Sequence, residues 1–530
     1  RDNNEVSMSA SRIATVVHHG LASKVISHFN FEAVQMAAQF LQLVPIADHG
    51  VLDCETESGK IYASGVNRMV CVILGEMCGD SEQQTSRWFN AAEECIQALF
   101  HIHPAADRVL GRIVSSMYAT LSSSGVTGGK VACSGARLSR FFFVLGQTAL
   151  NCLVLADDLT QKNRACKLAA QKAAIATEQS KNKSKKVSDH DAEHDAEMTA
   201  AIDMECEQEL LITLNQGLLM ENLLSKFLPM ITTVVASNEA GEASYASAML
   251  RQAATLSLCK FMAVSGLVCE KYLPLLFTAL EKTTDAACRT TIMVAMGDLM
   301  SRFPNALEQW TTYIYARLCD KHISVWYNAL MVLTHMILND MVKVKGQIVN
   351  VLVCLSDPDE KIRDLSKLFF LKLNERSTNP LHNLMGEVIS TITMEMSDAE
   401  RGLCSTSTNS TGTGSSTASG SSHNEVCSSR RVLTSAEYNL TIDFLLTFIK
   451  VIKQGDALLE RLLPRLALSQ TTVQKRALGL CISKLTVSPK GVKKIGEQLK
   501  QLKDALCDEE VYEYIFKCVK GTKKSTAVGA

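Results

Sequence analysis

The sequence predicts an all-α fold, and three observations lead to this prediction. Hydrophobic residues make up 47% of the 530 residues, but aromatic residues make up only 6% and prolines number only 9. Runs of Leu, Ala, Met, Val and Ile favour helices over the alternating pattern of sheet proteins. Apolar residues also recur with the helical period, and one helical unit repeats at a fixed spacing. A chain of this length accommodates three or four domains or one long repeat array.

The repeat is clearest in the middle of the chain, where segments that start at Asp285, His322 and Asp359 align at a constant spacing of 37 residues. The apolar positions that correspond farther along the segments are Ala295, Val332 and Phe369, and then Leu299, Met336 and Leu373. A second helix is predicted after each of them, at Leu307–Leu318, Val344–Leu355 and Leu381–Thr393. Two antiparallel helices in about 37 to 40 residues are typical of the HEAT/armadillo unit. Because such a pair cannot bury its apolar face alone, the sequence predicts a helical-repeat solenoid.

The start of each repeat suggests how neighbouring repeats are held together. Asp285 and Asp359 are placed to cap their helices, and the arginine that follows each of them is predicted to pair with the Asp of an adjacent repeat, forming a ladder. The middle copy departs from this pattern because it carries His322 and Trp326. Trp326 is interpreted either as core filler or as an anchor for a partner.

Composition divides the chain into repeat regions and two interruptions. One interruption is rich in charge, with a basic block followed by an acidic one, and the other is a tract of Ser, Thr and Gly that cannot bury enough surface to fold. The predicted segments are helical repeats at 1–176, a charged linker at 177–209, central HEAT repeats at 210–404, a disordered loop at 405–429, and helical repeats with a tail at 430–530. A weaker break at 122–135 is interpreted as an interhelical loop.

Charge and cysteine usage indicate a reduced compartment and no general affinity for nucleic acid. Lys and Arg total 54 and Asp and Glu total 55, so any DNA contact must be local. The 18 cysteines are scattered through apolar stretches, which is typical of reduced thiols in a cytosolic or nuclear protein. No run of 18 apolar residues occurs, so no membrane association is expected. The chain starts at Arg1, and we therefore expect a fragment.

No motif in the sequence indicates an enzyme. His190, Glu193 and His194 fit the H-x-x-E-H pattern of a zinc peptidase, but they lie in the charged segment, where HDAE occurs twice. A metallopeptidase centred on these three residues is therefore the less favoured alternative. Gly128 and Gly129 precede Lys130 in an incomplete phosphate-binding loop. We therefore predict no catalytic residues, no metal, no cofactor and no small-molecule substrate.

Local clusters of lysine are the candidate DNA contacts. Lys343 and Lys345 open the second helix of one repeat, and Lys490, Lys493 and Lys494 belong to a basic stretch near the C-terminus. Clustered lysines can contact phosphates without recognising sequence, although an ordinary solvated helix face is the favoured interpretation for each cluster taken alone. Ser488 precedes a proline and a lysine, so it is a candidate phosphorylation site or, alternatively, a helix N-cap.

Several segments resemble the condensin subunit 1 family, the HEAT-repeat non-SMC subunits of condensin I. They are CEKYLPLLFTALEK at 269–282, MVAMGDL at 293–299, RFPN at 302–305, YARL at 315–318 and LMVLTHMILNDMVKVKGQI at 330–348. The resemblance is close over 243–395, weaker over 140–242 and 430–520, and corresponds to the C-terminal portion of family members. Residues 1–130 are placed by continuity of the helical pattern alone.

The resemblance implies a non-catalytic regulatory scaffold that acts in mitotic chromosome condensation. The implied partners are the condensin kleisin subunit, the SMC ATPase heterodimer, the second HEAT-repeat subunit through the complex, and DNA or chromatin. The implied location is the nucleus and chromosomes in mitosis and the cytoplasm in interphase. A HEAT-repeat scaffold of another complex, such as a nuclear transport receptor or a phosphatase regulatory subunit, remains the alternative.

Overall fold

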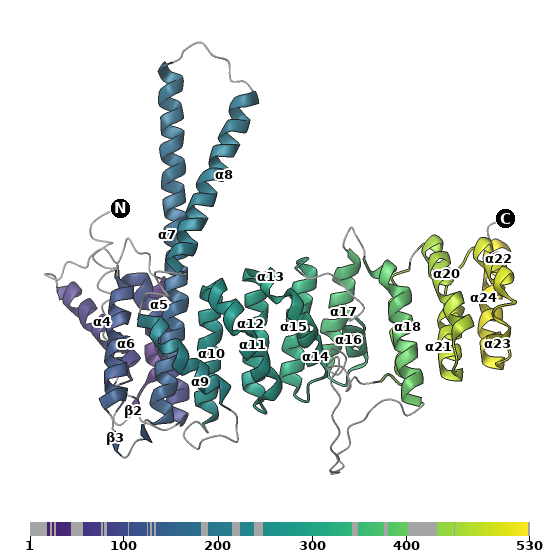
Figure 1. Ribbon diagram of the computed structural model, residues 1–530, viewed down its shortest axis with the longest axis horizontal. Helices are drawn as coiled ribbons and strands as arrows, with labels where there is room; N and C mark the ends of the chain where they lie inside the picture. Colours follow the sequence, from purple (N-terminus) through teal and green to yellow (C-terminus); the bar gives the residue numbers. More distant parts are fainter. Residues whose placement is uncertain are drawn as a thin grey trace, which may run out of the picture. The chain divides into compact units, whose positions relative to one another are not determined.

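Helices make up almost all of the structure, a computed structural model (Figure 1). The structure describes residues 19–21, 24–25, 28–43, 57–75, 78, 82–103, 105–123, 126–127, 130–131, 134–181, 189–214, 223–237, 247–341, 348–375, 380–400, 432–449 and 451–527. The strands within these ranges form two short antiparallel pairs, β1 (Lys24–Val25) with β2 (His28–Phe29) and β3 (Val126–Thr127) with β4 (Lys130–Val131). The second pair lies in the predicted break at 122–135. The predicted all-α fold is confirmed.

The chain divides into two compact units, residues 1–295 and residues 296–530. The division therefore does not fall in the charged segment at 177–209, where the sequence placed a separator between helical halves. The predicted Ser/Thr/Gly loop at 405–429 lies outside the described residues.

The first unit is built from long helices. They are α2 (Phe31–Leu43), α4 (Glu57–Leu74), α5 (Glu82–Ile102), α6 (Ala106–Ser123), α7 (Gly135–Lys181), α8 (Asp189–Ile212), the 3-10 helix η2 (Leu223–Phe227), α9 (Leu228–Ala236), α10 (Ala248–Val264), α11 (Gly266–Lys282) and the start of α12 (Ala286–Arg302). The first part of α7 lies at the centre, packed on α5, α6 and α10. Its residues 139–149 are all buried.

By length and composition α7 is apolar enough to cross a membrane, but 67% of its most apolar window is buried inside the unit. Its packing is that of a core helix. At Gly146, α7 approaches α10 so closely that an added methyl group would collide with Ser257. The hydroxyl of Ser257 donates to the carbonyl of Phe142 at 2.8 Å, which satisfies a buried polar group at this close approach.

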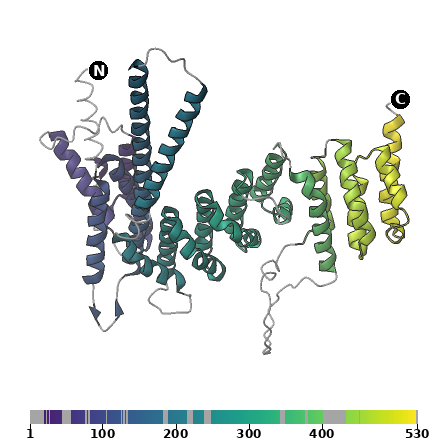
Figure 2. The same cartoon turned by 45° about the horizontal axis from the view of Figure 1, so that its top comes forward.

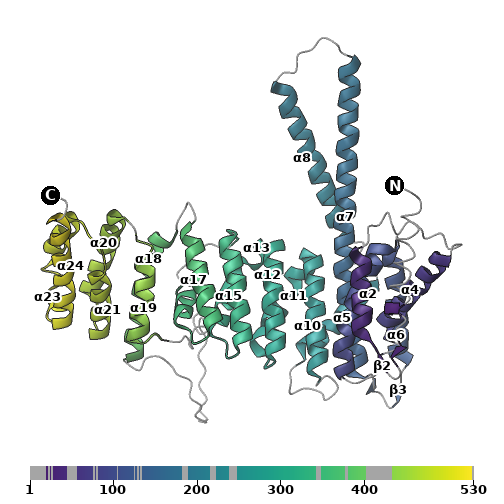
Figure 3. The ribbon, with the colours of Figure 1, turned by 180° about the vertical axis from the view of Figure 1, so that it is seen from behind.

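The second part of α7 pairs with α8, and this corrects the prediction of a linker at 177–209, because most of that segment is helical. The outer parts of α7 and α8 extend together away from the other helices of the unit (Figure 2, Figure 3). Arg164 pairs with Asp203 at 2.6 Å, and Lys167 lies 3.4 Å from both Glu205 and Glu209. Ala, Glu and Lys are good helix formers. Basic side chains on α7 face acidic side chains on α8. The composition that suggested a solvated linker therefore also builds an exposed helical hairpin.

The second unit is built mainly from shorter helices. They are α13 (Pro304–Leu307), η4 (Glu308–Trp310), α14 (Thr311–Ala316), η5 (Arg317–Cys319), α15 (Ile323–Leu338), α16 (Ile348–Val353), η6 (Cys354–Ser356), α17 (Glu360–Glu375), α18 (Pro380–Glu400), α19 (Ser435–Leu446), α20 (Ile452–Leu468), α21 (Thr472–Ser483), α22 (Pro489–Gln498), α23 (Lys503–Leu506) and α24 (Glu509–Ala527). The predicted 37-residue register is confirmed, since α12, α15 and α17 begin directly after Asp285, His322 and Asp359.

The second helices of the repeats differ from the prediction. The helix expected at Leu307–Leu318 is divided into short α-helical and 3-10 segments from α13 to η5. For the next repeat the structure describes a helix only from Ile348, as α16 and η6. In contrast, α18 is longer than the expected Leu381–Thr393.

The predicted capping by aspartate is confirmed. A carboxylate oxygen of Asp285 accepts a hydrogen bond from the backbone N–H of Ala287 at 2.9 Å, and Asp359 accepts one from Lys361 at 2.8 Å. These bonds satisfy N–H groups that have no partner inside the first turn of a helix. The middle copy lacks this cap, because the N-cap residue of α15 is His322 and its side chain makes no capping bond. Asp320 instead accepts a hydrogen bond from the N–H of His322, before the helix begins, at 3.0 Å.

The arginines of the repeat act within their own loops. Arg363 donates to the carbonyls of Asp357 and Pro358 at 2.7 and 2.8 Å. Arg289 makes the same pair of hydrogen bonds, at 2.9 and 3.0 Å, with the equivalent carbonyls before α12. The predicted ladder between repeats is therefore corrected for Arg363, whose charge closes the turn that precedes its helix.

Candidate partner-binding surfaces

Trp326 lies in the first turns of α15 and is half-buried. Its indole N–H donates to the Sγ atom of Cys354 in η6 at 3.2 Å. That thiol is buried and donates to the carbonyl of Asn350 at 3.2 Å. These bonds fix the indole against the neighbouring helix, as expected for core filler, while part of the ring remains at the surface. The role of Trp326 as a partner anchor stays a prediction.

The C-terminal lysines lie on α22, which begins at Pro489. Lys490 and Lys493 are exposed and lie three residues apart, on neighbouring positions of one helix face. Lys494 instead forms an ion pair with Glu460 of α20. Lys343 and Lys345 lie outside the described residues. The structure therefore brings two of the five candidate lysines together at an exposed surface and gives a third an acidic partner.

Ser488 is the N-cap of α22, as one of its two interpretations predicted. Its hydroxyl accepts from the N–H groups of Lys490 and Gly491 at 3.1 and 3.3 Å. Its own N–H donates to a carboxylate oxygen of Asp456 at 2.9 Å. A phosphate on Ser488 would replace this cap and lie near the Asp456 carboxylate, so phosphorylation would loosen the contact between α20 and α22. Modification at Ser488 itself stays a prediction.

The structure does not test the two sequence patterns that resemble a zinc-peptidase motif and a phosphate-binding loop. His190, Glu193 and His194 belong to α8, but their side chains are not among those described. Within the described part of the chain, no group of three or more His, Cys, Asp or Glu side chains is placed to hold a metal ion. Lys130 lies in the short strand β4, and Gly128 and Gly129 are outside the described residues.

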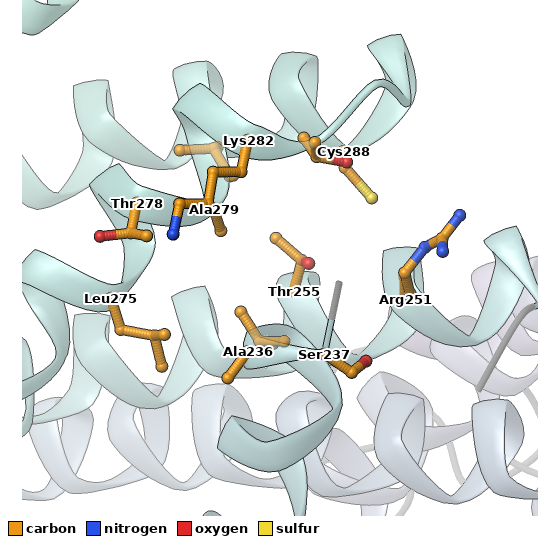
Figure 4. A pocket seen from close by; sticks show the side chains of 12 residues that line it. Ala236, Ser237, Arg251, Thr255, Leu275, Thr278, Ala279, Lys282 and Cys288 are labelled. Carbon is orange, nitrogen blue, oxygen red and sulfur yellow. The ribbon is translucent and has the colours of Figure 1, made fainter. Parts of the chain in front are cut away.

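A cavity of about 180 Å³ lies between α9, α10, α11 and the start of α12 (Figure 4). Two cationic side chains, Arg251 and Lys282, line it together with hydroxyl groups and aliphatic carbons, and none of its lining residues is acidic. Asp285, at the start of α12, accepts a hydrogen bond from the side chain of Gln252 at 2.8 Å. Burial opposes ionisation of Asp285, but the hydrogen bonds from Gln252 and Ala287 lower its pKa below the usual value. The carboxylate therefore stays ionised beside the cavity.

Cys288 is the group of this cavity that resembles a nucleophile. Burial, and then the neighbouring charge of Asp285, raise the pKa of its thiol to about 12. A thiol with such a pKa is protonated at neutral pH and reacts poorly. The cavity therefore offers no activated sulfur.

Comparison with known proteins adds the assignment that geometry alone does not give. Residues 287–483 match the family of the non-SMC mitotic condensation complex subunit 1, Cnd1. Over this segment the chain is similar to the condensin subunit 1 family. It is 34% identical to human condensin complex subunit 1 over 307 residues, which cover 58% of this chain and 19% of the human protein. It is 28% identical to condensin-1 complex subunit CAP-D2 of Arabidopsis thaliana over 490 residues, which cover 89% of this chain and 32% of that protein.

The chain thus spans about a third or less of the length of these condensin subunits. Among solved structures, a chain of the Schizosaccharomyces pombe condensin Cnd3–Cnd2 subcomplex aligns with 98% of this chain and 70% of its own length, at 10% identity and a TM-score of 0.39. That score is too low to carry an argument. The family match, in contrast, covers residues 287–395 of the close resemblance at 243–395 and extends to residue 483.

Sequence reasoning missed the cations of the cavity, Arg251 and Lys282. They come from different helices, separated by more than 30 residues, and no motif connects them. It also missed Glu387 and Asp398 on α18, although their spacing of 11 residues brings both to one helix face and was visible in the sequence.

Proposed function

We propose that the chain acts as part of a non-catalytic regulatory scaffold subunit of the condensin complex, in mitotic chromosome condensation. The observation that carries the proposal is the family match over 287–483, which falls on the region where the helix pairs repeat at 37-residue spacing. A stack of helix pairs offers a long continuous surface that suits extended partners and needs no catalytic pocket.

The proposed partners are the kleisin subunit and the SMC ATPase heterodimer, with the second HEAT-repeat subunit joined through the complex. The family name describes a non-SMC subunit of a mitotic condensation complex, and these partners are what the sequence resemblance implies for this chain. The proposed site of action is the mitotic chromosome in the nucleus, with the interphase protein in the cytoplasm.

Affinity purification of the tagged full chain from extract of dividing cells tests the proposal. We expect a kleisin and two coiled-coil ATPases to be retained at moderate salt. Because the chain covers about a third or less of its relatives, a tagged full-length relative is the matched positive control. Recovery of a small GTPase or a phosphatase catalytic subunit, with no kleisin, would contradict the assignment and support another scaffold.

DNA binding is a separate part of the proposal and depends on the lysines. Replacing Lys490 and Lys493 with Glu is expected to weaken duplex binding several-fold and to flatten its dependence on salt, because fewer counterions are released. Replacing Lys494 alone should have a smaller effect, since Glu460 already neutralises part of its charge. Lys343→Glu with Lys345→Glu tests the other predicted cluster. Duplex affinity would be measured by fluorescence anisotropy at several salt concentrations.

The matched control reverses Lys367 and Lys372 on α17, which pair with the nearby acids Asp364 and Glu375 on the same helix. The control changes net charge by the same amount at another surface of the second unit. Equal losses of affinity in both double variants would show a general charge effect and remove the proposed role of Lys490 and Lys493.

A further inference from the structure

A groove of about 510 Å³ lies between α18 and the junction of α20 with α21, within the second unit. One wall is a single face of α18, formed by Glu387, Thr391, Met394 and Asp398. These residues are spaced by four, three and four positions, which is the spacing of a stripe along one side of a helix. Leu468, at the end of α20, lines the opposite wall.

Charged and apolar side chains alternate along this groove. Glu387 and Asp398 are both exposed and are 11 residues apart, which places their backbone positions about 16 Å apart along the helix axis. Met394 lies between them and is 55% exposed, and Leu468 is 80% exposed. Large apolar side chains this exposed within a recess are characteristic of binding surfaces. The groove thus has carboxylates toward its two ends and apolar side chains between them.

The two walls are fixed to one another by hydrogen bonds. Arg465 of α20 donates to the carbonyl of Gly386 and, at 2.8 Å, to the hydroxyl of Ser390. Near the other end, the hydroxyls of Ser397 and Thr471 are hydrogen-bonded at 2.7 Å. Binding to such a preformed groove does not require the helices to be ordered first. Arg465 is the single cation among the lining residues, and its guanidinium is engaged with α18, so the carboxylates give the groove a negative balance.

We propose that this groove docks an extended peptide segment in which one apolar side chain lies between two basic residues. Alternate side chains of an extended chain point to the same face, so residues one, three and five would face the groove together. In an extended peptide of five residues, the Cα atoms of the basic residues at positions one and five are about 13 Å apart. The long basic side chains can span the remaining distance to the two carboxylates. The apolar side chain would pack on Met394 and Leu468. This inference concerns a surface that the condensin proposal does not specify, and it holds or fails independently of it.

Fluorescence anisotropy of the full chain with a labelled Lys-Ser-Leu-Ser-Lys peptide tests the inference. We expect saturable binding that the double variant Glu387→Lys, Asp398→Lys weakens at least tenfold. The milder pair Glu387→Gln, Asp398→Asn should also weaken binding, and circular dichroism would show that each variant remains helical. Peptides with Ser in place of Leu, or Glu in place of both Lys, should bind at least tenfold more weakly.

The matched control reverses two exposed carboxylates outside the groove, Glu497 on α22 and Glu513 on α24. It gives the same change in net charge and should leave peptide binding unchanged. Equal loss in control and groove variants, equal binding of the peptide that lacks Leu, or no binding of the Lys-Ser-Leu-Ser-Lys peptide would each overturn the proposal. Failure to recover a kleisin in the affinity purification would instead bear on the proposed function alone.

Discussion

Replacing Gly455 with alanine is expected to lower the free energy of unfolding by about 2 to 3 kcal/mol, because it overpacks a helix contact. Gly455 lies inside α20, and a Cβ atom at this position would collide with the backbone carbonyl oxygen of Thr486, in the loop before α22. A backbone atom cannot turn aside as a side chain can, so α20 and that loop would have to separate. Thermal unfolding followed by circular dichroism measures the loss, expected as a shift of several degrees.

Gly496→Ala is the matched control, because a Cβ atom at Gly496 in α22 meets no other atom within 4 Å. There the substitution should stabilise the chain by about 0.5 to 1 kcal/mol, since alanine has the higher helix propensity. If Gly455→Ala left the unfolding transition where Gly496→Ala leaves it, the close approach of α20 to the loop at Thr486 would be contradicted.

The parts of the fold that sequence predicted well are those encoded by short-range patterns. The starts of α12, α15 and α17 depend on an aspartate near each helix start and on apolar residues spaced by three and four, and both signals lie within one repeat. In contrast, no proline or glycine occurs between Asn305 and Leu318, yet the helix expected there is divided by 3-10 turns. No local signal marks those breaks, so packing against neighbours must decide them.

The charged segment shows the limit of composition as evidence. Composition correctly indicates that the described side chains of α8, from residue 197 onward, are mostly exposed. It cannot show that Arg164 meets Asp203, because 39 residues separate them in the chain. Surface ion pairs of this kind contribute only about 0 to 1 kcal/mol each. Several such ion pairs nevertheless join α7 to α8, and both helices are rich in good helix formers. The result is a helical hairpin where a linker was expected.

For the candidate sites, too, contacts between sequence neighbours could be predicted and contacts between distant residues could not. Ser488 could be interpreted as an N-cap because its proline and its bonding partners are sequence neighbours. Lys494 looked like an available cation, but it meets Glu460 across 34 positions, and Trp326 meets Cys354 across 28. Residue type identifies which side chains are able to bind a partner. Tertiary packing determines which of them remain exposed and which are already paired with another residue of the chain.

Trp88→Ala is expected to be the most damaging single substitution in the first unit, at about 3 to 5 kcal/mol, because it leaves a large cavity in the core. Trp88 on α5 is fully buried, and its indole N–H donates to the carbonyl of Val72 on α4 at 2.6 Å. The ring lies edge-on to Phe89 and Phe143, with centroids 5.6 and 6.0 Å away. One side chain therefore joins α4, α5 and the buried part of α7.

Two further variants separate the contributions of Trp88. Trp88→Phe keeps an aromatic ring but removes the indole hydrogen bond to the Val72 carbonyl, which still accepts from the N–H of Gly75 at 3.0 Å. The lost hydrogen bond is expected to cost about 0.5 to 1.5 kcal/mol. Trp310→Ala, at a half-buried position in the second unit, should cost less than Trp88→Ala. Urea unfolding, followed by circular dichroism, gives the order of the three. An equal effect of Trp88→Ala and Trp310→Ala would contradict the expectation that Trp88 is a central contact among α4, α5 and α7.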